Sequence, residues 1–242
     1  MPAVVGGTWT PVSTSPSGTV LARAIRVSVG ASSFVAVRVT KNARLKLYPS
    51  GAISPVDRPN AILSFNGAFN PGDAGGMTGF FGGPGTVTNG MAAAVGYQDG
   101  GFDVGVWGRN LPAAGRPVHW ARTNLFNLLV DGGQPTAATG DPGQWGTPLN
   151  TIGMNTARSA MGVDGDGNLL YVASMATLPG PLAQVLVSVG AQRAMELDIN
   201  PWWTMAFAYS GGGTNNLVQN GNHPDDVFSS GWDRDFFVAT TS

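Results

Sequence analysis

The sequence predicts a β-rich α+β domain with a mixed sheet and few helices. Only 11% of the 242 residues are charged, whereas 36 glycines and 17 prolines supply more than a fifth of the chain. This composition is typical of a turn-rich β protein, and a hydrophobic share of 43% is enough to fill a core. We expect one domain, in which residues 1–60 form an N-terminal strand region and residues 61–242 form the core.

The strands expected in the first half are short runs of β-branched or alternating apolar residues, bounded by Gly and Pro. They cover residues 20–27, 33–39, 44–48, 61–65, 92–97 and 102–107. Asp99-Gly100-Gly101 joins the last two strands as a hairpin turn. The glycine-dense residues 75–85 have two interpretations, a loop that moulds around a ligand or an irregular surface loop. They match no phosphate-binding loop or dinucleotide fingerprint, and no cofactor is expected.

A second hairpin is predicted around Asp164-Gly165-Asp166-Gly167-Asn168, between strands at residues 157–163 and 169–173. This run resembles the start of a calcium loop, but Met175 stands where such a loop needs a bidentate glutamate. We therefore favour a turn and expect no metal at this position. Residues 134–156 form a loop whose length is typical of a functional lid or of disorder, and the sequence does not decide between them.

One helix is predicted over residues 180–190, because apolar residues recur there at helical spacing after two prolines and before Gly190. These apolar residues are Leu182, Val185, Leu186 and Val189. Strands near residues 168–174 and 194–199 flank the helix. If the two strands are parallel, the three elements form a right-handed crossover unit; the alternative is a helix packed on an antiparallel sheet. A terminal strand is expected within residues 232–239.

The strand at residues 194–199 carries the strongest functional signal of the chain. Alternation directs Met195, Leu197 and Ile199 to one face and predicts that Glu196 and Asp198 share the other. Glu196 is the only glutamate, against thirteen aspartates, so it does not belong to a generally Glu-rich surface. Either this is an edge strand with a solvated face, or the two carboxylates line a polar pocket at the end of the strand. We favour the pocket.

Charge and residue types argue against several classes of function. The net charge is −1 and basic residues do not cluster, so nucleic-acid binding is not expected. The absence of cysteine removes disulfides and thiol chemistry, and two isolated histidines argue against a zinc site. No apolar run reaches the roughly 18–20 residues of a membrane span. The first residues lack the basic and apolar regions of a signal peptide, which predicts a soluble chain.

Four separated segments carry a further pattern. They are residues 64–70 (SFNGAFN), residues 158–167 (RSAMGVDGDG), residues 196–203 (ELDINPWW), and residues 222–224 (NHP) with 234–238 (RDFFV). In order and spacing they resemble the phosphodiester glycosidase family, which includes the mannose-6-phosphate uncovering enzyme. The third block lacks the glycine run L-D-G-G-G-S of that family. It is more similar to a bacterial or phage-type branch that carries E-L-D-I-N-P-x-W.

The resemblance implies hydrolysis of a sugar 1-phosphodiester, with a glycan or sugar phosphate as the partner. It gives Asp198 the role of attacking C1 or activating water, and Glu196 that of acid/base or electrostatic partner. Arg158 would hold the phosphate. The residues that would bind substrate are Asn66, Asn200, Trp202 and His223.

Each of these residues also has a plainer interpretation. Arg158 would then only neutralise an acid, and Asn66 would occupy a left-handed turn position. His223 would be a loop residue, and Trp202 part of the core.

A function of a different class remains open at this point. A β-dominated chain rich in Gly, Asn and aromatic residues, without an export signal, also suits a phage tail or other virion or surface-assembly protein. Such a protein would bind cell-wall glycan through the same pocket without cutting it, and would be extracellular or virion-associated. It would be a homo-oligomer or part of a larger assembly.

Overall fold

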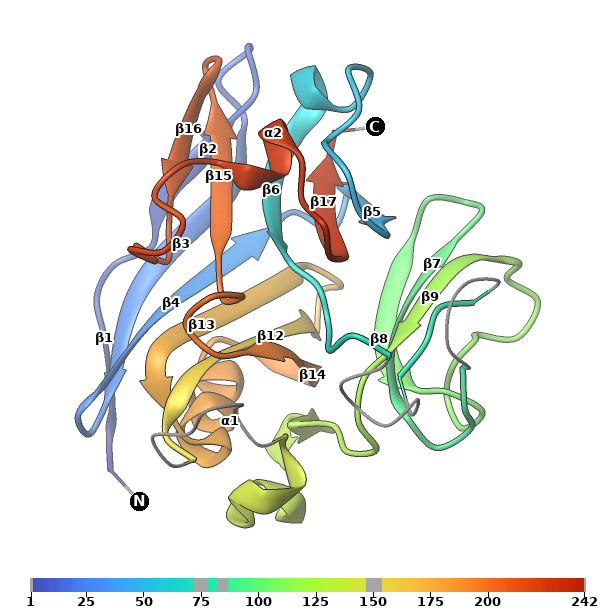
Figure 1. The fold of residues 1–242 in the computed structure, drawn as a ribbon, viewed down its shortest axis with the longest axis vertical. Helices are drawn as coiled ribbons and strands as arrows, with labels where there is room; N and C mark the ends of the chain where they lie inside the picture. Colours follow the sequence, from blue (N-terminus) through green and yellow to red (C-terminus); the bar gives the residue numbers. More distant parts are fainter. Residues whose placement is uncertain (1, 72–77, 82–86, 147–153, 242) are drawn as a thin grey trace.

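The structure is a computed structural model, and it describes residues 2–71, 78–81, 87–146 and 154–241 (Figure 1). Strands hold 47% of the residues and helices 11%, which confirms a β-rich chain with few helices. The strands form three sheets of nine, five and three strands. No helix in the described part of the chain has the length and apolar run needed to cross a membrane.

The nine-stranded sheet has the order β1-β3-β4-β13-β12-β14-β10-β11, with β2 paired to β3. It combines the N-terminal strands with the second half of the chain, because β4 pairs with β13. The strands are β1 (Val4–Gly6), β2 (Thr10–Thr14), β3 (Val20–Val29), β4 (Ser32–Val39), β10 (Val130–Asp131), β11 (Gln134–Pro135), β12 (Thr156–Asp164), β13 (Leu169–Thr177) and β14 (Ala191–Ile199).

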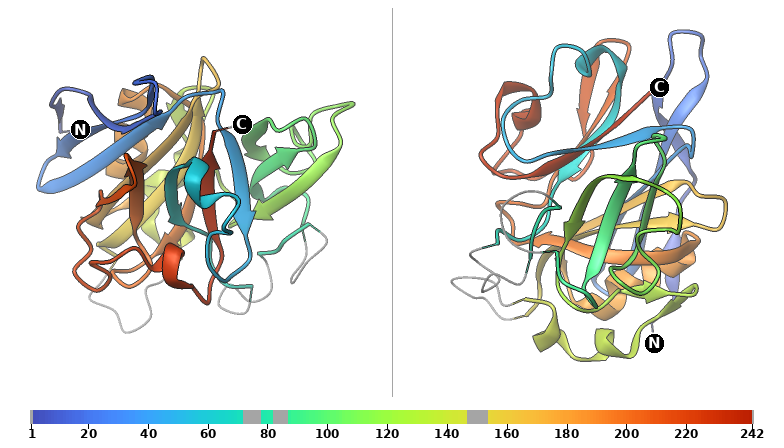
Figure 2. Two further views of the ribbon diagram at one scale, coloured as in Figure 1. Left: turned by 90° about the horizontal axis from the view of Figure 1, so that it is seen from above. Right: turned by 90° about the vertical axis from the view of Figure 1, so that its right-hand side faces the viewer.

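The five-stranded sheet has the order β16-β15-β6-β17-β5, and the three-stranded sheet the order β8-β7-β9. Two views of the ribbon show the three-stranded sheet standing beside the larger sheets, next to β5 (Figure 2). The strands are β5 (Arg44–Tyr48), β6 (Ala61–Asn66), β7 (Ala92–Tyr97), β8 (Phe102–Val106), β9 (Val118–Thr123), β15 (Ala206–Ser210), β16 (Gly213–Asn216) and β17 (Phe236–Thr240).

The ladders between these described strands are antiparallel, so the predicted mixed sheet is wrong in its pairing. β13 and β14 run in the same direction, as a crossover unit requires, but β12 lies between them. The reason is the hairpin at residues 164–168, which pairs β12 with β13 before the chain crosses over. The Asp164 carboxylate accepts from the backbone N–H groups of Asp166 at 3.0 Å and Asn168 at 2.9 Å, which confirms the predicted turn.

Helix α1 (Pro179–Ser188) connects β13 to β14 and packs on one face of the nine-stranded sheet (Figure 1). It begins at a proline, which lacks the N–H that a first helical residue leaves unpaired. Gly190 follows with a φ of 97°, a conformation that favours glycine and turns the chain into β14. Leu182, Val185 and Leu186 are fully buried against the sheet, as their spacing predicted. The short helix α2 (Val227–Ser230) precedes β17.

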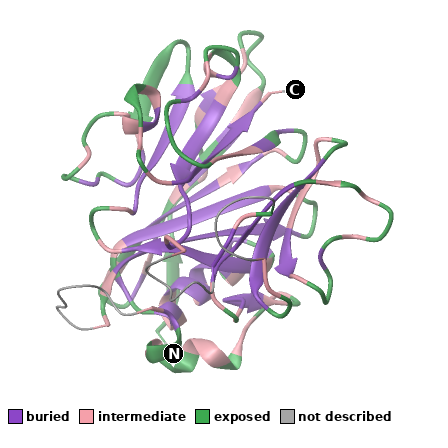
Figure 3. Ribbon diagram, turned by 45° about the vertical axis from the view of Figure 1, so that its right-hand side comes forward, coloured by how far each residue is buried: buried purple, intermediate pink, exposed green. Residues whose placement is uncertain are grey.

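The opposite face of the sheet packs against the other two sheets, and the strands at this centre are buried while exposed residues concentrate in the loops (Figure 3). Phe65 of β6 stacks on Phe237 of β17 with ring centroids 5.3 Å apart, and meets Tyr171 of β13 at 4.9 Å. Met195 and Leu197 belong to the same cluster. Apolar packing of Met195 and Leu197 thereby holds this face of β14 in place.

The predicted loop at residues 134–156 has more structure than expected in its described part. Two short 3₁₀ helices, Ala137–Gly140 and Pro142–Gln144, precede Trp145, whose side chain is fully buried. Its indole N–H donates to the Ala138 carbonyl at 2.9 Å. Most of the glycine-dense run at residues 75–85 lies outside the described residues, so its two interpretations stay open.

Candidate active site

An extra residue in β14 changes how the two acidic side chains are placed. Arg158 of β12 is paired with Ile199, and Ala160 with Glu196, so two residue steps on β12 face three on β14. Such a β-bulge interrupts strict alternation. Glu196 lies on the same side of β14 as Ala194, which packs with α1. Asp198 instead contacts Arg234, just before β17. The predicted shared face of the two carboxylates is therefore wrong.

Glu196 forms a buried ion pair with Arg158. Nη1 of Arg158 donates to Oε1 of Glu196 at 2.7 Å, and the side chains are 0% and 1% exposed. Further N–H groups of the guanidinium donate to backbone carbonyls, those of Trp145 at 2.9 Å, Met154 at 3.0 Å and Thr177 at 3.3 Å. The alternative of a solvated edge strand is wrong at this position. Arg158 is a neutralising partner of Glu196, while a role in binding phosphate stays a prediction.

Asp198 forms its ion pair with Arg234, a residue just before β17. One carboxylate oxygen accepts from Arg234, and the other accepts from the backbone N–H of Ile199 at 2.9 Å. The backbone N–H of Asp198 donates to the Gly67 carbonyl at 2.8 Å, a bond that the bulge makes available. The Asp198 side chain is 7% exposed and that of Arg234 11%, so this pair is more accessible than Glu196 and Arg158.

A third buried ion pair, between Arg122 of β9 and Asp235, supports the Asp198 pair. Arg122 binds both carboxylate oxygens of Asp235, at 2.9 and 3.1 Å, and also donates to the Phe69 carbonyl at 2.6 Å. Asp235 in turn accepts from the backbone N–H of Ala68 at 3.2 Å. The pair therefore ties the three-stranded sheet to the segment after β6 and to the residue next to Arg234.

Asn66 lies at the end of β6 and is 2% exposed. Its side-chain amide donates to Ser159 Oγ at 2.9 Å, and its oxygen accepts from Tyr171 Oη at 3.1 Å and from the Met205 backbone at 3.3 Å. Asn66 thus joins three strands and the start of β15, and its alternative as a left-handed turn residue is wrong. That conformation belongs to Asn200, with a φ of 81°.

Asn200 ends β14 and turns the chain into an aromatic cluster. Its side-chain oxygen accepts from the Trp202 backbone N–H at 2.8 Å. Trp202 is 55% exposed, which contradicts its alternative as a core residue. The ring of His223 lies 6.0 Å from Trp202 and 5.1 Å from Trp232. Trp203 connects this cluster to the Asp198–Arg234 ion pair, because its ring lies 4.3 Å from the Arg234 guanidinium carbon.

Burial raises the pKa of both carboxyl groups. It raises the pKa of Glu196 to about 7, against the lowering effect of Arg158 and with a further increase from the charge of Asp198. It likewise raises the pKa of Asp198 to about 7, against the effect of Arg234 and with a further increase from Asp235. Carboxyl groups with pKa values near neutral pH can both accept and release a proton, as general acid–base catalysis requires.

These shifts predict that the two carboxyl groups make the fold less stable as the pH rises from about 4 to about 7. In that window the folded state holds protons that the unfolded state has released, because the folded pKa values are the higher ones. Each group contributes a slope of up to about 1.4 kcal/mol per pH unit to the free energy of unfolding. Urea unfolding across this range measures the slope, and Asp198→Asn should flatten it. An equal slope in wild type and variant would contradict the prediction.

The sequence predicted that Arg158 neutralises an acidic residue, which is Glu196, but it did not indicate the partner of Asp198. Arg234 and Asp235 were noted as part of the closing block, and Arg122 was not noted at all. A useful signal was present, because Arg234 and Asp235 place opposite charges side by side just before a strongly apolar strand. Among the described residues, no group of three or more His, Asp or Glu side chains is arranged to hold a metal ion.

Comparison with known proteins shows a distant likeness in fold. No protein-family profile and no curated protein sequence matches the chain. The catalytic domain of zebrafish N-acetylglucosamine-1-phosphodiester alpha-N-acetylglucosaminidase, auto-inhibited by its pro-peptide, has a TM-score of 0.55 and 12% identity. The alignment covers 100% of this chain and 84% of that domain. At this level of identity the likeness shows a shared fold.

Two further solved structures align over most of this chain. A hypothetical protein from Synechocystis has a TM-score of 0.49 and 15% identity, with 93% of this chain and 63% of that one covered. A protein from Burkholderia pseudomallei has a TM-score of 0.44 and 12% identity, with 99% and 86% covered.

Proposed function

We propose that this protein is a hydrolase that cleaves a sugar 1-phosphodiester on a cell-envelope or similar glycan, outside the cell or on a virion. The observation that carries the proposal is the pair of buried carboxyl groups with raised pKa values, each held by its own arginine. The distant fold likeness to a phosphodiester glycosidase domain supports it. A phosphate leaving group is a weak base, so the reaction depends more on a carboxylate and a cation than on a strong acid.

Asp198 is the residue we assign to the reacting carbon. It is the more accessible carboxyl group of the two, and two hydrogen bonds fix its side chain at the end of a rigid strand. Ionised, it can attack C1 or remove a proton from water. Glu196 is the second carboxyl group, and its Oε2 is buried with no hydrogen-bond partner among the described residues. That oxygen is suited to hold or transfer a proton.

We assign the phosphate to Arg234 rather than to Arg158. The Arg158 guanidinium is fully buried and bonded to Glu196 and to backbone carbonyls. Arg234 is the more exposed of the two and lies beside Asp198 and the aromatic cluster. An arginine fork suits phosphate oxygens. The exposed indole of Trp202 is suited to stack on a sugar ring, with His223 and Asn200 shaping that surface.

A release assay tests this function. Purified protein is incubated with a panel of sugar 1-phosphodiesters that differ in sugar and in the group beyond the phosphate, and free sugar is measured. Asp198→Asn is expected to lower turnover by about 10²- to 10⁴-fold, because it removes the reacting carboxylate. The matched control is Asp166→Asn, which makes the same change in an exposed hairpin turn and should leave turnover unchanged.

Two outcomes would count against the proposal. Unchanged turnover in Asp198→Asn would remove that residue from its role. No release from any substrate by the wild type, together with binding of cell-wall glycan that Trp202→Ala abolishes, would instead indicate a non-catalytic glycan-binding protein of a virion or surface assembly.

A further inference from the structure

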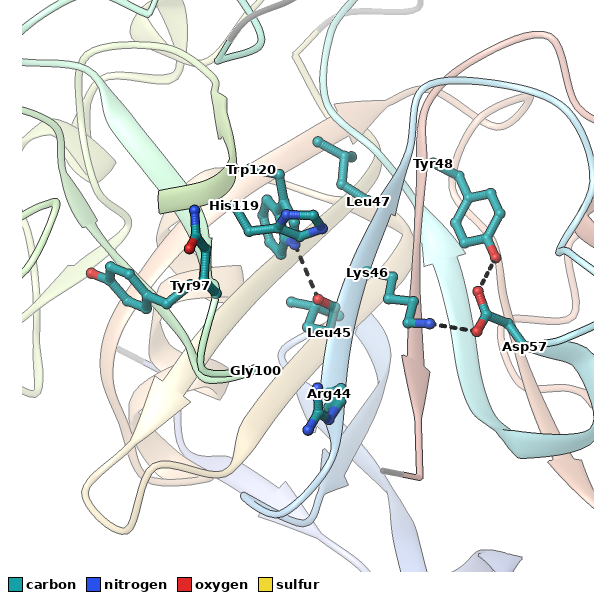
Figure 4. Close-up of a pocket in the computed structure, with 11 residues that line it drawn as sticks. Arg44, Leu45, Lys46, Leu47, Tyr48, Asp57, Tyr97, Gly100, His119 and Trp120 are labelled. Atoms are coloured by element: carbon teal, nitrogen blue, oxygen red, sulfur yellow. Dashed lines mark hydrogen bonds and ion pairs between the residues drawn. The ribbon is translucent and has the colours of Figure 1, made fainter. Parts of the chain in front are cut away.

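A hollow lies between strand β5 and the three-stranded sheet, and its lining includes neither Glu196 nor Asp198 (Figure 4). It has a volume of about 450 Å³, within the size range of small-molecule sites. One wall is the strand Arg44–Tyr48, and the other carries His119 and Trp120 of β9. We call this hollow the β5–β9 furrow.

The furrow is lined by more positive than negative charge. Arg44 and Lys46 project from β5 into a lining whose carboxylate is that of Asp57. The charges of Arg44, Lys46 and Asp57 sum to +1. Asp57 is already bound by Lys46 and by the Tyr48 hydroxyl, as Figure 4 shows. The net field in the furrow therefore favours an anion.

Arg44 is the group that this charge balance leaves without a counter-ion. Nine basic side chains form ion pairs with other described residues. Arg44 is not one of them and has no acidic partner among the described residues. Its guanidinium lies against the turn at Gly100, where a Cβ would come within 3.0 Å of the guanidinium carbon. The nearby Asp99 is bound by Arg116 through both oxygens, at 2.8 and 2.9 Å. Arg44 thus spans from β5 to the three-stranded sheet with its donors available to a ligand.

We propose that the β5–β9 furrow binds a small anion, an organic phosphate or carboxylate, with Arg44 as its principal contact. The planar guanidinium offers two parallel donors to such a group, and Lys46 and His119 line the furrow around it. An added peptide strand fits less well, because the Trp120 indole N–H already donates to the Leu45 carbonyl at 3.1 Å and occupies the free edge of β5. This site is separate from the proposed catalytic residues.

The two histidines of the chain allow a direct test, because they report on different sites. His119 lines the furrow, whereas His223 lies in the aromatic cluster beside the candidate active site. We would titrate the full chain with inorganic phosphate, and separately with acetate, at constant pH and ionic strength, and follow the imidazole signals by NMR. His119→Asn assigns the two signals. A saturable shift at His119 is the expected result, and any shift at His223, which reports on the phosphate site proposed at Arg234, should follow a separate affinity.

Arg44→Gln should weaken this binding about tenfold, which corresponds to loss of one charge-assisted hydrogen-bonded contact. Arg23→Gln is the matched control, since Arg23 is exposed, also lacks an ion pair among the described residues and lies outside the furrow. Its affinity should equal that of the wild type. An unchanged His223 signal in the free variant shows that the fold is retained.

Two results would overturn the inference. These are a His119 signal that does not respond to either anion, and an affinity measured at His119 that Arg44→Gln leaves unchanged. Neither depends on turnover of a sugar phosphodiester, so failure here and failure of the proposed hydrolase function are distinguishable.

Discussion

Replacement of Arg158 by methionine is expected to lower the free energy of unfolding by about 3–5 kcal/mol. The substitution leaves the Glu196 carboxyl group buried without its cation, at 1% exposure. It also removes the donor from the backbone carbonyls of Trp145, Met154 and Thr177. Urea denaturation followed by circular dichroism at a pH above the raised pKa of Glu196 measures the effect.

A double variant separates the buried charge from the loss of packing. Arg158→Met combined with Glu196→Leu removes both charges and should recover most of the lost stability, because a buried pair replaced by apolar groups is often neutral. The single variant should also lose less at about pH 5, where Glu196 takes up a proton. A double variant no more stable than Arg158→Met would show that the uncompensated charge is not the cause.

Replacement of Arg122 by methionine is also expected to lower the free energy of unfolding by about 3–5 kcal/mol. Arg122 is fully buried and holds Asp235 through two hydrogen bonds, while a third bond reaches the Phe69 carbonyl. Its loss leaves a second buried carboxylate unpaired and detaches β9 from the segment after β6. The same denaturation experiment measures it.

Arg116→Met provides a control beside the same sheet, in the connection before β9, with the same pattern of two hydrogen bonds. Arg116 also binds an aspartate, Asp99, through two hydrogen bonds, but the side chains are 37% and 56% exposed. Solvent screens such a pair, so the loss of the pair and of the contact of Arg116 with the Tyr97 ring should cost far less stability than Arg122→Met. Similar losses for Arg122→Met and Arg116→Met would contradict the assignment of the effect to burial.

Local sequence patterns predicted most of the strands and α1, since alternation, helical spacing and turn residues act over a few residues. The strands that were not predicted are β1, β2, β9, β10, β11, β15 and β16, and for β9 and β15 the physical reason is clear. In β9 a buried arginine interrupts the apolar pattern, and its partner Asp235 lies 113 residues further along the chain. In β15, Ala206–Ser210 follows a turn with two tryptophans and has little β-branched character. The pairing that stabilises both strands is tertiary.

At the candidate site, the sequence located the acidic strand but not the arrangement around it. Chain spacing alone predicts that Glu196 and Asp198 share one face, and only the register against β12 reveals the extra residue that separates their partners. The resemblance in four blocks brought Arg158 and Asn66 to the same region. It did not indicate that Arg234 holds Asp198, because that contact depends on where β17 enters its sheet.

The position of β17 also has a consequence for how the protein acquires its fold. This last strand lies between β6 and β5, with Phe237 opposite both Phe65 and Leu47. Strands β5 and β6 therefore lack their shared neighbour until residues 236–240 have been synthesised. Closing so long a loop precedes any stabilising contact, which slows assembly. During synthesis, the apolar edges of β5 and β6 remain available to chaperones and to aggregation.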